Sequence, residues 1–399
     1  MKYIRQKSKK EILIALLGLI LLLSTCVVPG RQTVRPVVPM VIPDYTNLAR
    51  QVEITRTDYG VPHILGDNLK AMAFGMAWCQ MEDYGARVAE SLVAARGIAA
   101  KVFANPELIE SDFWRKRSYN RAVETYHQLH QDTRDVLEGF AAGVTAYTWS
   151  HPKEFAEWPF LVFTGHDVSA LTIGGPNRGL IQRFKRELRQ QEQDPDASRA
   201  GVSEDGSNSW AFAPSRTTTG NTILLRNPHL SWEAGYYEAH LIVPGVIDFY
   251  GDIRIGGAFA IIGGFNRRLG WATTNNAPDL DEIYELTLDR NRPDHFLFDG
   301  ASIAIRHVPV EIEYVDKEGK LAFEVREHLE TPIGPVFHSS ESSIFVIRSS
   351  NDGEYRRGEQ YLRMMQATNL EEWKTAMHMQ AIGSSNYTYA DADGNILLV

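Results

Sequence analysis

GSNSWAF, at residues 206–212, is the stretch that decides how this chain is organised. It follows QQEQDPDASRAGVSED (190–205), whose composition includes almost nothing that could enter a hydrophobic core. The WAF end of the stretch then begins an apolar strand. A sharp change of composition therefore falls directly before a small residue, Gly206, and a hydroxyl residue, Ser207.

The two sides of this junction carry different patterns. Helical spacing of apolar residues dominates 49–189, where Asp67 is the expected N-cap of one helix running to residue 95. Alternating patterns predict strands over most of 207–399, including 303–315 and 343–347. Helices followed by strands predict an α+β fold, with 190–206 as a spacer between the two parts.

The N-terminus has the pattern of an export signal. Five basic residues precede an apolar run at 12–23, which is too short to span a bilayer, so 1–26 is predicted as a signal peptide and 27–48 as a tether. The residues ending at Cys26 resemble a bacterial lipobox, apart from Thr25. A lipid anchor at Cys26, plain secretion and an uncleaved anchor remain open, and each predicts an extracytoplasmic protein, either periplasmic or membrane-anchored and facing the periplasm.

Composition excludes some classes of protein. The 399 residues include 44% hydrophobic and 23% charged residues, as in a globular protein. The 41 Lys and Arg residues against 50 Asp and Glu residues give a net charge of −9, which argues against nucleic-acid binding. Two cysteines are too few for a disulfide framework, so Cys79 is predicted to be a buried small apolar residue.

Ser207 has a setting that suits internal peptide cleavage. Cutting the Gly206–Ser207 bond would leave Ser207 with both a nucleophilic hydroxyl and a free α-amine, whose pKa of about 7.7–8.0 lets it act as a base near neutrality. A serine after a loop also commonly caps a strand or turn. The spacing of these residues alone does not separate the two readings.

GSNSWAF resembles the processing site of the penicillin acylase family of N-terminal-nucleophile hydrolases. Five further stretches resemble this family in the same order: ITRTDYGVPHI (54–64), AFGMAWCQMED (73–83), RNPHLSW (226–232), GFNRRLGWATTN (264–275) and NYTYADADGNI (386–396). The resemblance implies a four-layer αββα sandwich and a precursor that cuts itself at Gly206–Ser207. The α chain and the β chain that begins at Ser207 would stay associated after cleavage.

The resemblance also implies roles for residues near Ser207. His229 would assist the amine of the nucleophile, and Leu230 would line the acyl pocket, where an aliphatic side chain favours a fatty acyl group. A backbone N–H at Asn276 or at Asn275 would stabilise the oxyanion of the tetrahedral intermediate. The family's second oxyanion donor has no match in this sequence, which resembles only the N-terminal part of a β chain.

Asp279, Asp281 and Glu282 follow the expected oxyanion strand, where family members often bind Ca²⁺. Carboxylate oxygens suit this hard cation, with Asp279 and Glu282 the favoured ligands. The alternative is a solvated acidic loop. Any such ion would be structural, because the expected chemistry needs no cofactor.

The sequence therefore predicts an amidohydrolase that cleaves a small N-acyl amide through an acyl-enzyme on Ser207. Acyl-homoserine lactones, β-lactam side chains and lipopeptides remain open as substrates. Two alternatives are a non-catalytic lipoprotein on the same scaffold and a conventional Ser-His-Asp hydrolase that uses His63 or His229.

Overall fold

A computed structural model of the chain describes residues 44–156, 158–191, 206–230, 235–276 and 278–399. The expected signal peptide, Cys26, most of the tether and most of the spacer lie outside the described residues. Within the described ranges, no helix is both long enough and apolar enough to cross a bilayer. The last residues of the expected tether belong to a short helix, α2.

The region before the spacer is mostly helical, as predicted. Its first strands, β1 (Val52–Arg56) and β2 (Pro62–Gly66), form an antiparallel hairpin whose turn uses Gly60 at φ +86°. The helices are α2 (Thr46–Ala49), α3 (Leu69–Tyr84), α4 (Ala86–Arg96), α5 (Ala99–Val102), α6 (Ile109–Thr125), α7 (Gln131–Ser150), α8 (Gly165–Ala170) and α9 (Arg178–Gln191), with 3₁₀ turns at Pro106–Leu108 and Tyr126–Gln128.

The expectation of one helix from an Asp67 cap to residue 95 is wrong at two points. The N-cap is Asn68, whose Oδ1 accepts a hydrogen bond from the Ala71 N–H at 2.9 Å. The helix then ends at Gly85, whose φ of +42° starts α4 in a new direction. Two helices therefore take the place of one.

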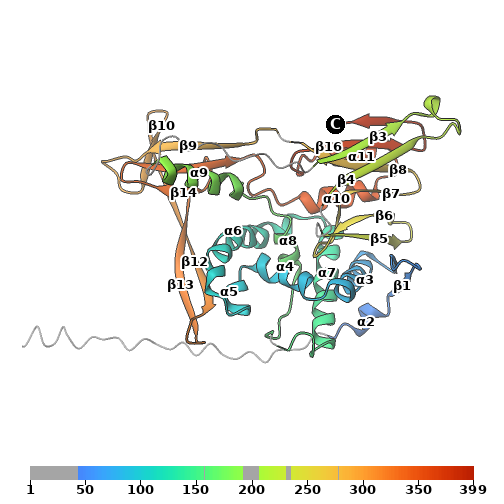
Figure 1. Ribbon diagram of the computed structural model, residues 1–399, viewed down its shortest axis with the longest axis horizontal. Helices are drawn as coiled ribbons and strands as arrows, with labels where there is room; N and C mark the ends of the chain where they lie inside the picture. Colours follow the sequence, from blue (N-terminus) through green and yellow to red (C-terminus); the bar gives the residue numbers. More distant parts are fainter. Residues whose placement is uncertain (1–43, 157, 192–205, 231–234, 277) are drawn as a thin grey trace, which may run out of the picture. The chain divides into compact units, whose positions relative to one another are not determined.

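An eight-stranded sheet forms the centre of the fold (Figure 1). Its order is β1, β2, β5 (Tyr236–Val243), β6 (Ile247–Arg254), β7 (Ala260–Phe265), β8 (Leu269–Asn275), β16 (Ser385–Asp391) and β17 (Ile396–Leu398). Only the β2–β5 pair is parallel, which joins the N-terminal hairpin to strands from beyond the spacer. The two sides of the GSNSWAF junction therefore share one sheet.

Helices cover one face of this sheet. Helix α3 packs on β2 and β5, and α10 (Arg357–Gln366) packs on β6 and β7, with α11 (Leu370–Met377) beside it. The side chain of Trp271 on β8 is fully buried and its ring stacks near those of Phe249 and Tyr361. Helices α10 and α11 were not predicted from the sequence, although Asn369 caps α11 by accepting a hydrogen bond from the Glu372 N–H.

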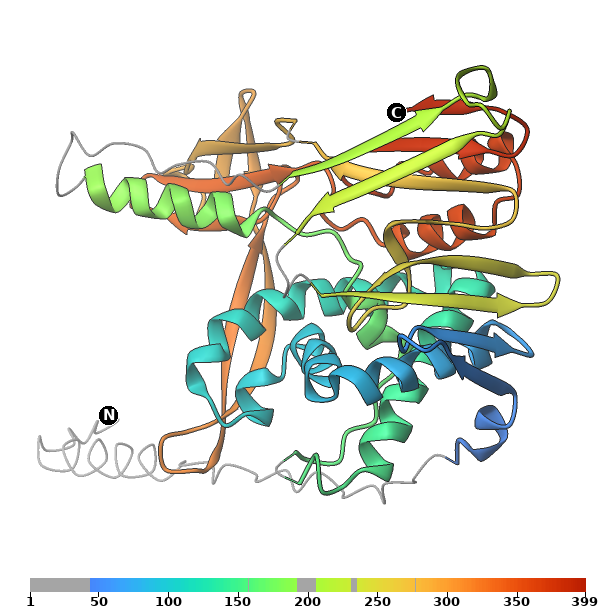
Figure 2. The ribbon, with the colours of Figure 1, turned by 45° about the vertical axis from the view of Figure 1, so that its right-hand side comes forward.

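A hairpin of β3 (Gly206–Phe212) and β4 (Ile223–His229) lies on the other face, over β8 and β16 (Figure 2). A 3₁₀ turn at Pro214–Arg216 connects its strands. The α+β prediction is confirmed. Of the four-layer sandwich, the described residues contain a helical layer, the large sheet and this hairpin, and the remaining layers stay a prediction.

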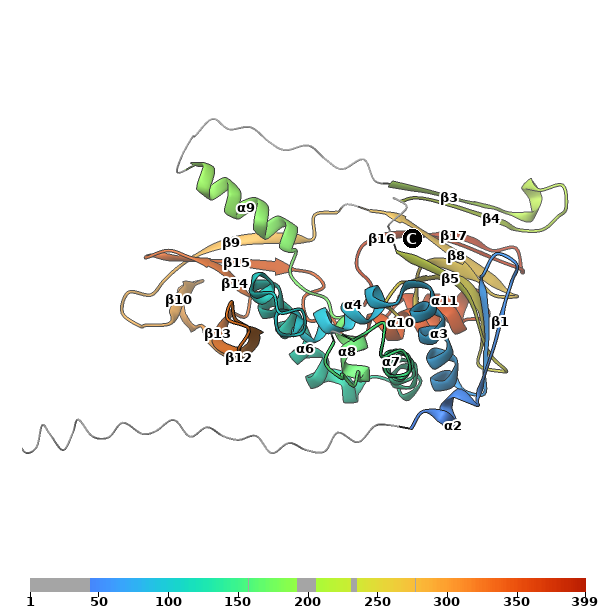
Figure 3. The same ribbon diagram turned by 60° about the horizontal axis from the view of Figure 1, so that its bottom comes forward.

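The other strands build an extension beside α5, α6 and α9 (Figure 3). They are the three-stranded sheet β14 (Val336–Ser339), β15 (Ser343–Ser349) and β9 (Asp281–Thr287), the hairpin of β10 (His295–Phe298) and β11 (Ala301–Ala304), and the hairpin of β12 (Arg306–Val315) and β13 (Leu321–Glu330). The single strand expected over 303–315 is two strands, because the chain turns at buried Ile305. Ile181 of α9 packs with Phe337 and Ile347.

Close contact between α3 and α7 gives the first prediction. A Cβ atom on Gly139 would lie 2.1 Å from the backbone oxygen of Lys70, so Gly139→Ala must push the two helices apart. We expect the free energy of unfolding to fall by about 2–3 kcal/mol in urea titrations. Gly179→Ala in α9, where the nearest atom is 3.3 Å away, is the control and should be neutral or slightly stabilising. Equal effects of both changes would contradict this account.

Candidate active site

Ser207 lies on β3 at the start of the hairpin. Its hydroxyl donates a hydrogen bond to the carbonyl oxygen of Gly206 at 2.7 Å. The two strands pair so that Gly206 is opposite His229 and Ser207 is opposite Pro228. The hydroxyl of the expected nucleophile is therefore next to the peptide bond that the sequence analysis expects to be cut.

Polar contacts hold the hairpin on the sheet below it. The hydroxyls of Ser209 and Thr388 are 2.6 Å apart, and the Thr222 hydroxyl donates to the Asp391 carbonyl oxygen at 2.7 Å. Arg226 of β4 forms an ion pair with Asp252 of β6. Trp210 and Phe212 alternate with Ser209 along β3 and are 44% and 42% exposed.

A cavity of about 640 Å³ lies between the hairpin and the strands beneath it. Ser207 and Ser209 line it from β3, Thr274 from β8, and Asn386 from β16. The remaining wall is formed by residues of β3, β16 and β17: Asn208, Trp210, Ala211, Thr388, Ile396, Leu397 and Leu398. Polar side chains and an apolar strand thus meet beside the expected nucleophile.

The hairpin register brings His229, the residue before Leu230, close to Ser207. A Cβ atom built on Gly206 would lie 3.8 Å from Nδ1 of His229, so the imidazole is beside the residue that precedes the nucleophile. Nε2 of His229 is 3.3 Å from Nδ2 of Asn227. Leu230 directly follows β4 and is 43% exposed. The roles expected for both residues stay predictions.

Asn275 and Asn276 end the strand that borders the cavity. Asn275 is the last residue of β8 and pairs with Ser385, whereas Asn276 follows the strand and is exposed. Nδ2 of Asn386 lies 3.0 Å from the Thr274 hydroxyl and 3.2 Å from the Asn275 carbonyl oxygen, and it donates to both. The sequence analysis did not assign a role to Asn386, although it opens the matched stretch NYTYADADGNI.

The three acidic residues expected to bind calcium are not gathered around one point. Asp281 accepts a hydrogen bond from Asn177 at 2.8 Å, and Glu282 accepts one from the Tyr284 hydroxyl. Asp279 and Glu282 line a cavity of about 260 Å³ that Arg348 also lines. Within the described ranges, no three Asp, Glu, His or Cys side chains are grouped to hold a metal ion. This arrangement does not fit a calcium cage, and calcium binding stays a prediction.

His63 takes part in a different cluster on the sheet. Its Nδ1 is 2.9 Å from Nδ1 of His240, and Nε2 of His240 is 2.7 Å from Asp248. Hydrogen bonds from Arg267 and from His240 lower the pKa of Asp248. In the part of the chain that the structure describes, neither imidazole is hydrogen-bonded to a serine, so the cluster gives no support to a Ser-His-Asp triad through His63.

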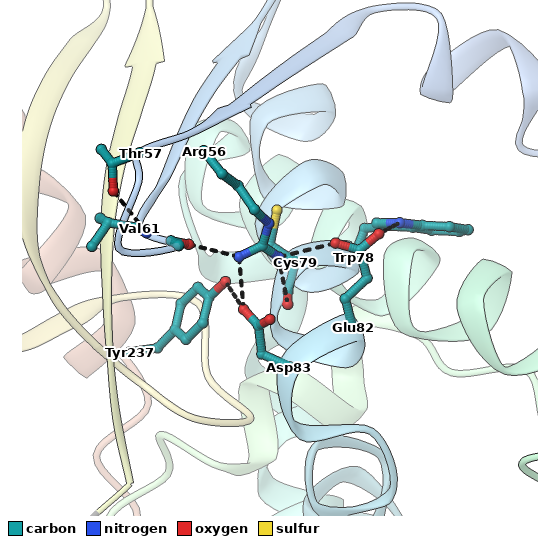
Figure 4. Close-up of polar contacts among 9 residues, drawn as sticks. Arg56, Thr57, Val61, Trp78, Cys79, Glu82, Asp83 and Tyr237 are labelled. Atoms are coloured by element: carbon teal, nitrogen blue, oxygen red, sulfur yellow. Dashed lines mark hydrogen bonds and ion pairs between the residues drawn. The ribbon is translucent and has the colours of Figure 1, made fainter.

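Two of the matched stretches meet in a cluster around Arg56 (Figure 4). The Arg56 guanidinium donates to Glu82 and Asp83 of α3 at 2.9 Å each, and the Tyr237 hydroxyl of β5 donates to Asp83 at 2.6 Å. This network joins β1, α3 and β5. Nearby Cys79 is fully buried, as predicted, and burial raises the pKa of its thiol to about 12, which makes it a poor nucleophile.

The ion pair between Arg226 and Asp252 gives the second prediction. Burial raises the pKa of Asp252, and the positive charge of Arg226 opposes that rise. Arg226→Ala leaves the carboxylate without its partner, so we expect a loss of about 2–3 kcal/mol of unfolding free energy at pH 7.5, less than for a fully buried pair. Urea titration measures this loss.

The loss should shrink as the pH falls towards 4.5. The pKa of Asp252 rises further in the variant, so its folded state takes up a proton more readily than its unfolded state and gains relative stability in acid. Arg268→Ala removes the exposed ion pair with Asp393 and is the control, with an expected loss of at most about 0.5 kcal/mol. A loss for Arg226→Ala that is the same at both pH values would contradict the prediction.

Curated relatives of this chain are acylases. The chain is 25% identical over 385 residues to an acyl-homoserine lactone acylase PvdQ of Pseudomonas fluorescens, covering 86% of this chain and 49% of the relative. It is 26% identical over 396 residues to the aculeacin-A acylase of Actinoplanes utahensis, with coverages of 86% and 49%. The chain thus spans about half the length of these relatives.

A solved structure and a family model also match this chain. A thermostable penicillin G acylase from Alcaligenes faecalis, in its orthorhombic form, matches with 25% identity and a TM-score of 0.41 over 48% of this chain and 34% of that one. The family model described as penicillin amidase matches residues 51–399, which include the whole sheet and the hairpin that carries Ser207. The chain belongs to the penicillin amidase family.

Proposed function

We propose that this chain carries the nucleophile of an enzyme that hydrolyses N-acyl amides, and that the nucleophile is Ser207 after cleavage of the Gly206–Ser207 bond. The observation that carries the proposal is the 2.7 Å contact between the Ser207 hydroxyl and the Gly206 carbonyl oxygen. Family membership supports amide hydrolysis as the type of reaction. The relatives named as acylases support the same reaction.

Maturation would begin at this contact. Oγ of Ser207 attacks the carbonyl carbon of Gly206, and the bond from that carbon to the Ser207 nitrogen breaks, which leaves an ester and a free amine. Water then hydrolyses the ester. The products are a carboxylate on Gly206 and a β chain that begins with Ser207.

The same hydroxyl would next attack the carbonyl carbon of the substrate amide. The α-amine of Ser207 takes the hydroxyl proton and passes it to the leaving amine, and water releases the acid from the acyl-enzyme. The backbone N–H of Asn276 or Asn275 stabilises the oxyanion, at the end of the strand that borders the cavity. His229, opposite Gly206, assists the amine.

The surroundings of Ser207 favour an aliphatic acyl group on the substrate. Leu230 follows β4, and Ala211, Ile396 and Leu398 line the cavity that Ser207 borders. Both relatives are named for acylated substrates, an acyl-homoserine lactone and aculeacin A.

We propose that the enzyme lies outside the cytoplasm, on the basis of the N-terminal pattern at 1–26.

N-terminal sequencing of the purified protein tests the maturation step. We expect a chain that begins Ser-Asn-Ser-Trp, and we expect Ser207→Ala to remain uncut and without amidase activity, because both reactions need the same hydroxyl. Ser215→Ala, in the turn of the same hairpin, is the control and should be cut and active. A single uncut chain with full amidase activity would sink the mechanism.

A further inference from the structure

Asn386 makes two contacts at the end of β8 that suggest a role in the reaction. It pairs with Thr274 across the β8–β16 ladder, and the next pair, Asn275 with Ser385, is the last one. Its amide Nδ2 donates to the Thr274 hydroxyl at 3.0 Å and to the Asn275 carbonyl oxygen at 3.2 Å. One side chain therefore holds two successive residues at the point where the ladder stops.

The carbonyl oxygen of Asn275 belongs to the same peptide unit as the N–H of Asn276. This unit is planar and trans, so its C=O and N–H point in opposite directions. A donor on the oxygen fixes the rotation of the whole unit and polarises its N–H. The last pair of the β8–β16 ladder is Asn275 with Ser385, so the Asn276 side of this unit has no pair in that ladder.

Thr274, the residue directly before Asn275, shares a cavity with the expected nucleophile. Ser207, Thr274 and Asn386 line the same cavity, although they come from three different strands. Asn386 is related to the two candidate oxyanion donors in different ways. The N–H of Asn276 is in the peptide unit whose carbonyl oxygen Asn386 contacts. Along the chain, the N–H of Asn275 lies between the Thr274 hydroxyl and the Asn275 carbonyl oxygen, which both accept hydrogen bonds from Asn386.

We propose that Asn386 is a positioning residue of the hydrolytic site, which orients and polarises the backbone N–H that stabilises the oxyanion. This inference rests on the proposed function. Asn386 acts through the peptide at Asn275 and need not touch the substrate. Its loss should therefore weaken the transition state more than the bound substrate.

Asn386→Asp is the sharpest test, because aspartate keeps the shape of asparagine but an ionised carboxylate cannot donate. We expect kcat to fall about 10–100-fold, which is no more than the effect of losing an oxyanion donor outright. KM should change less than about twofold. Turnover is expressed per mole of chains that begin with Ser207, as counted by N-terminal sequencing. Thr274→Val removes one of the two acceptors and keeps the hydrogen bond from Asn386 to the Asn275 carbonyl oxygen. It should disturb the site less, still mature, and lower kcat by a smaller factor.

Inhibitor binding separates positioning from a general structural role. A straight-chain alkylboronic acid forms a tetrahedral adduct with a serine hydroxyl, whereas the matching carboxylic acid binds as product. We expect the inhibition constant of the boronic acid to rise by the same factor as kcat/KM falls in Asn386→Asp, with the affinity for the carboxylic acid unchanged. Asn266→Ala removes the hydrogen bond to the Ala367 carbonyl oxygen and those from the N–H groups of Arg268 and Leu269. It is the matched control and should change neither constant.

Two results would overturn the inference: an unchanged kcat in Asn386→Asp, or an equal loss of affinity for the boronic acid and the carboxylic acid. Failure of the proposed function is a different result. In that case the unmodified protein would not hydrolyse acyl amides, or Ser207→Ala would retain activity. The inference about Asn386 is judged on protein whose activity depends on Ser207.

Discussion

The seating of the β3–β4 hairpin on the large sheet is the constraint on which the candidate site depends. Ser207 lies on β3, and the packing of this hairpin on the sheet brings it to β8 and β16. The hydroxyl pair of Ser209 and Thr388 fixes the hairpin along the sheet. The ion pair of Arg226 and Asp252 fixes it across the sheet. A sheet face made of Gly, Ala and Thr at the contact allows this close approach, as at Gly270, which lies under Leu224.

Support for that sheet comes from the helical side. Trp271 on β8 is buried between the sheet and α10, and Phe249 and Tyr361 lie against it. Residues on alternate sides of β8 therefore have different tasks: Trp271 anchors the strand in the core, and Thr274 faces the cavity. The Arg56 network ties the N-terminal hairpin to α3 and β5, so residues from before the spacer brace the sheet that carries the site.

Local signals in the sequence predicted much of this correctly. The strand that begins at GSNSWAF, the buried Cys79 and the α+β class all follow from short-range patterns. The break at Gly85 and the helices α10 and α11 were missed. Whether a glycine ends a helix, and whether an amphipathic segment between strands is helical, depends on what the segment packs against. Asn386 was missed for a related reason: its partners, Thr274 and Asn275, are more than a hundred residues away in the chain.

By itself, the sequence determined which reactive residue types stand near the junction: a hydroxyl residue after a glycine, an imidazole shortly after it, and two adjacent asparagines further along. These depend on residue types and short spacings, which are written directly in the chain. Only the tertiary structure decided that Gly206 lies opposite His229, and that Ser207 shares a cavity with Thr274 and Asn386. It also decided that Asp281 and Glu282 accept hydrogen bonds from Asn177 and Tyr284. Strand register and sheet packing set these distances, and both arise from contacts between segments that are remote in sequence.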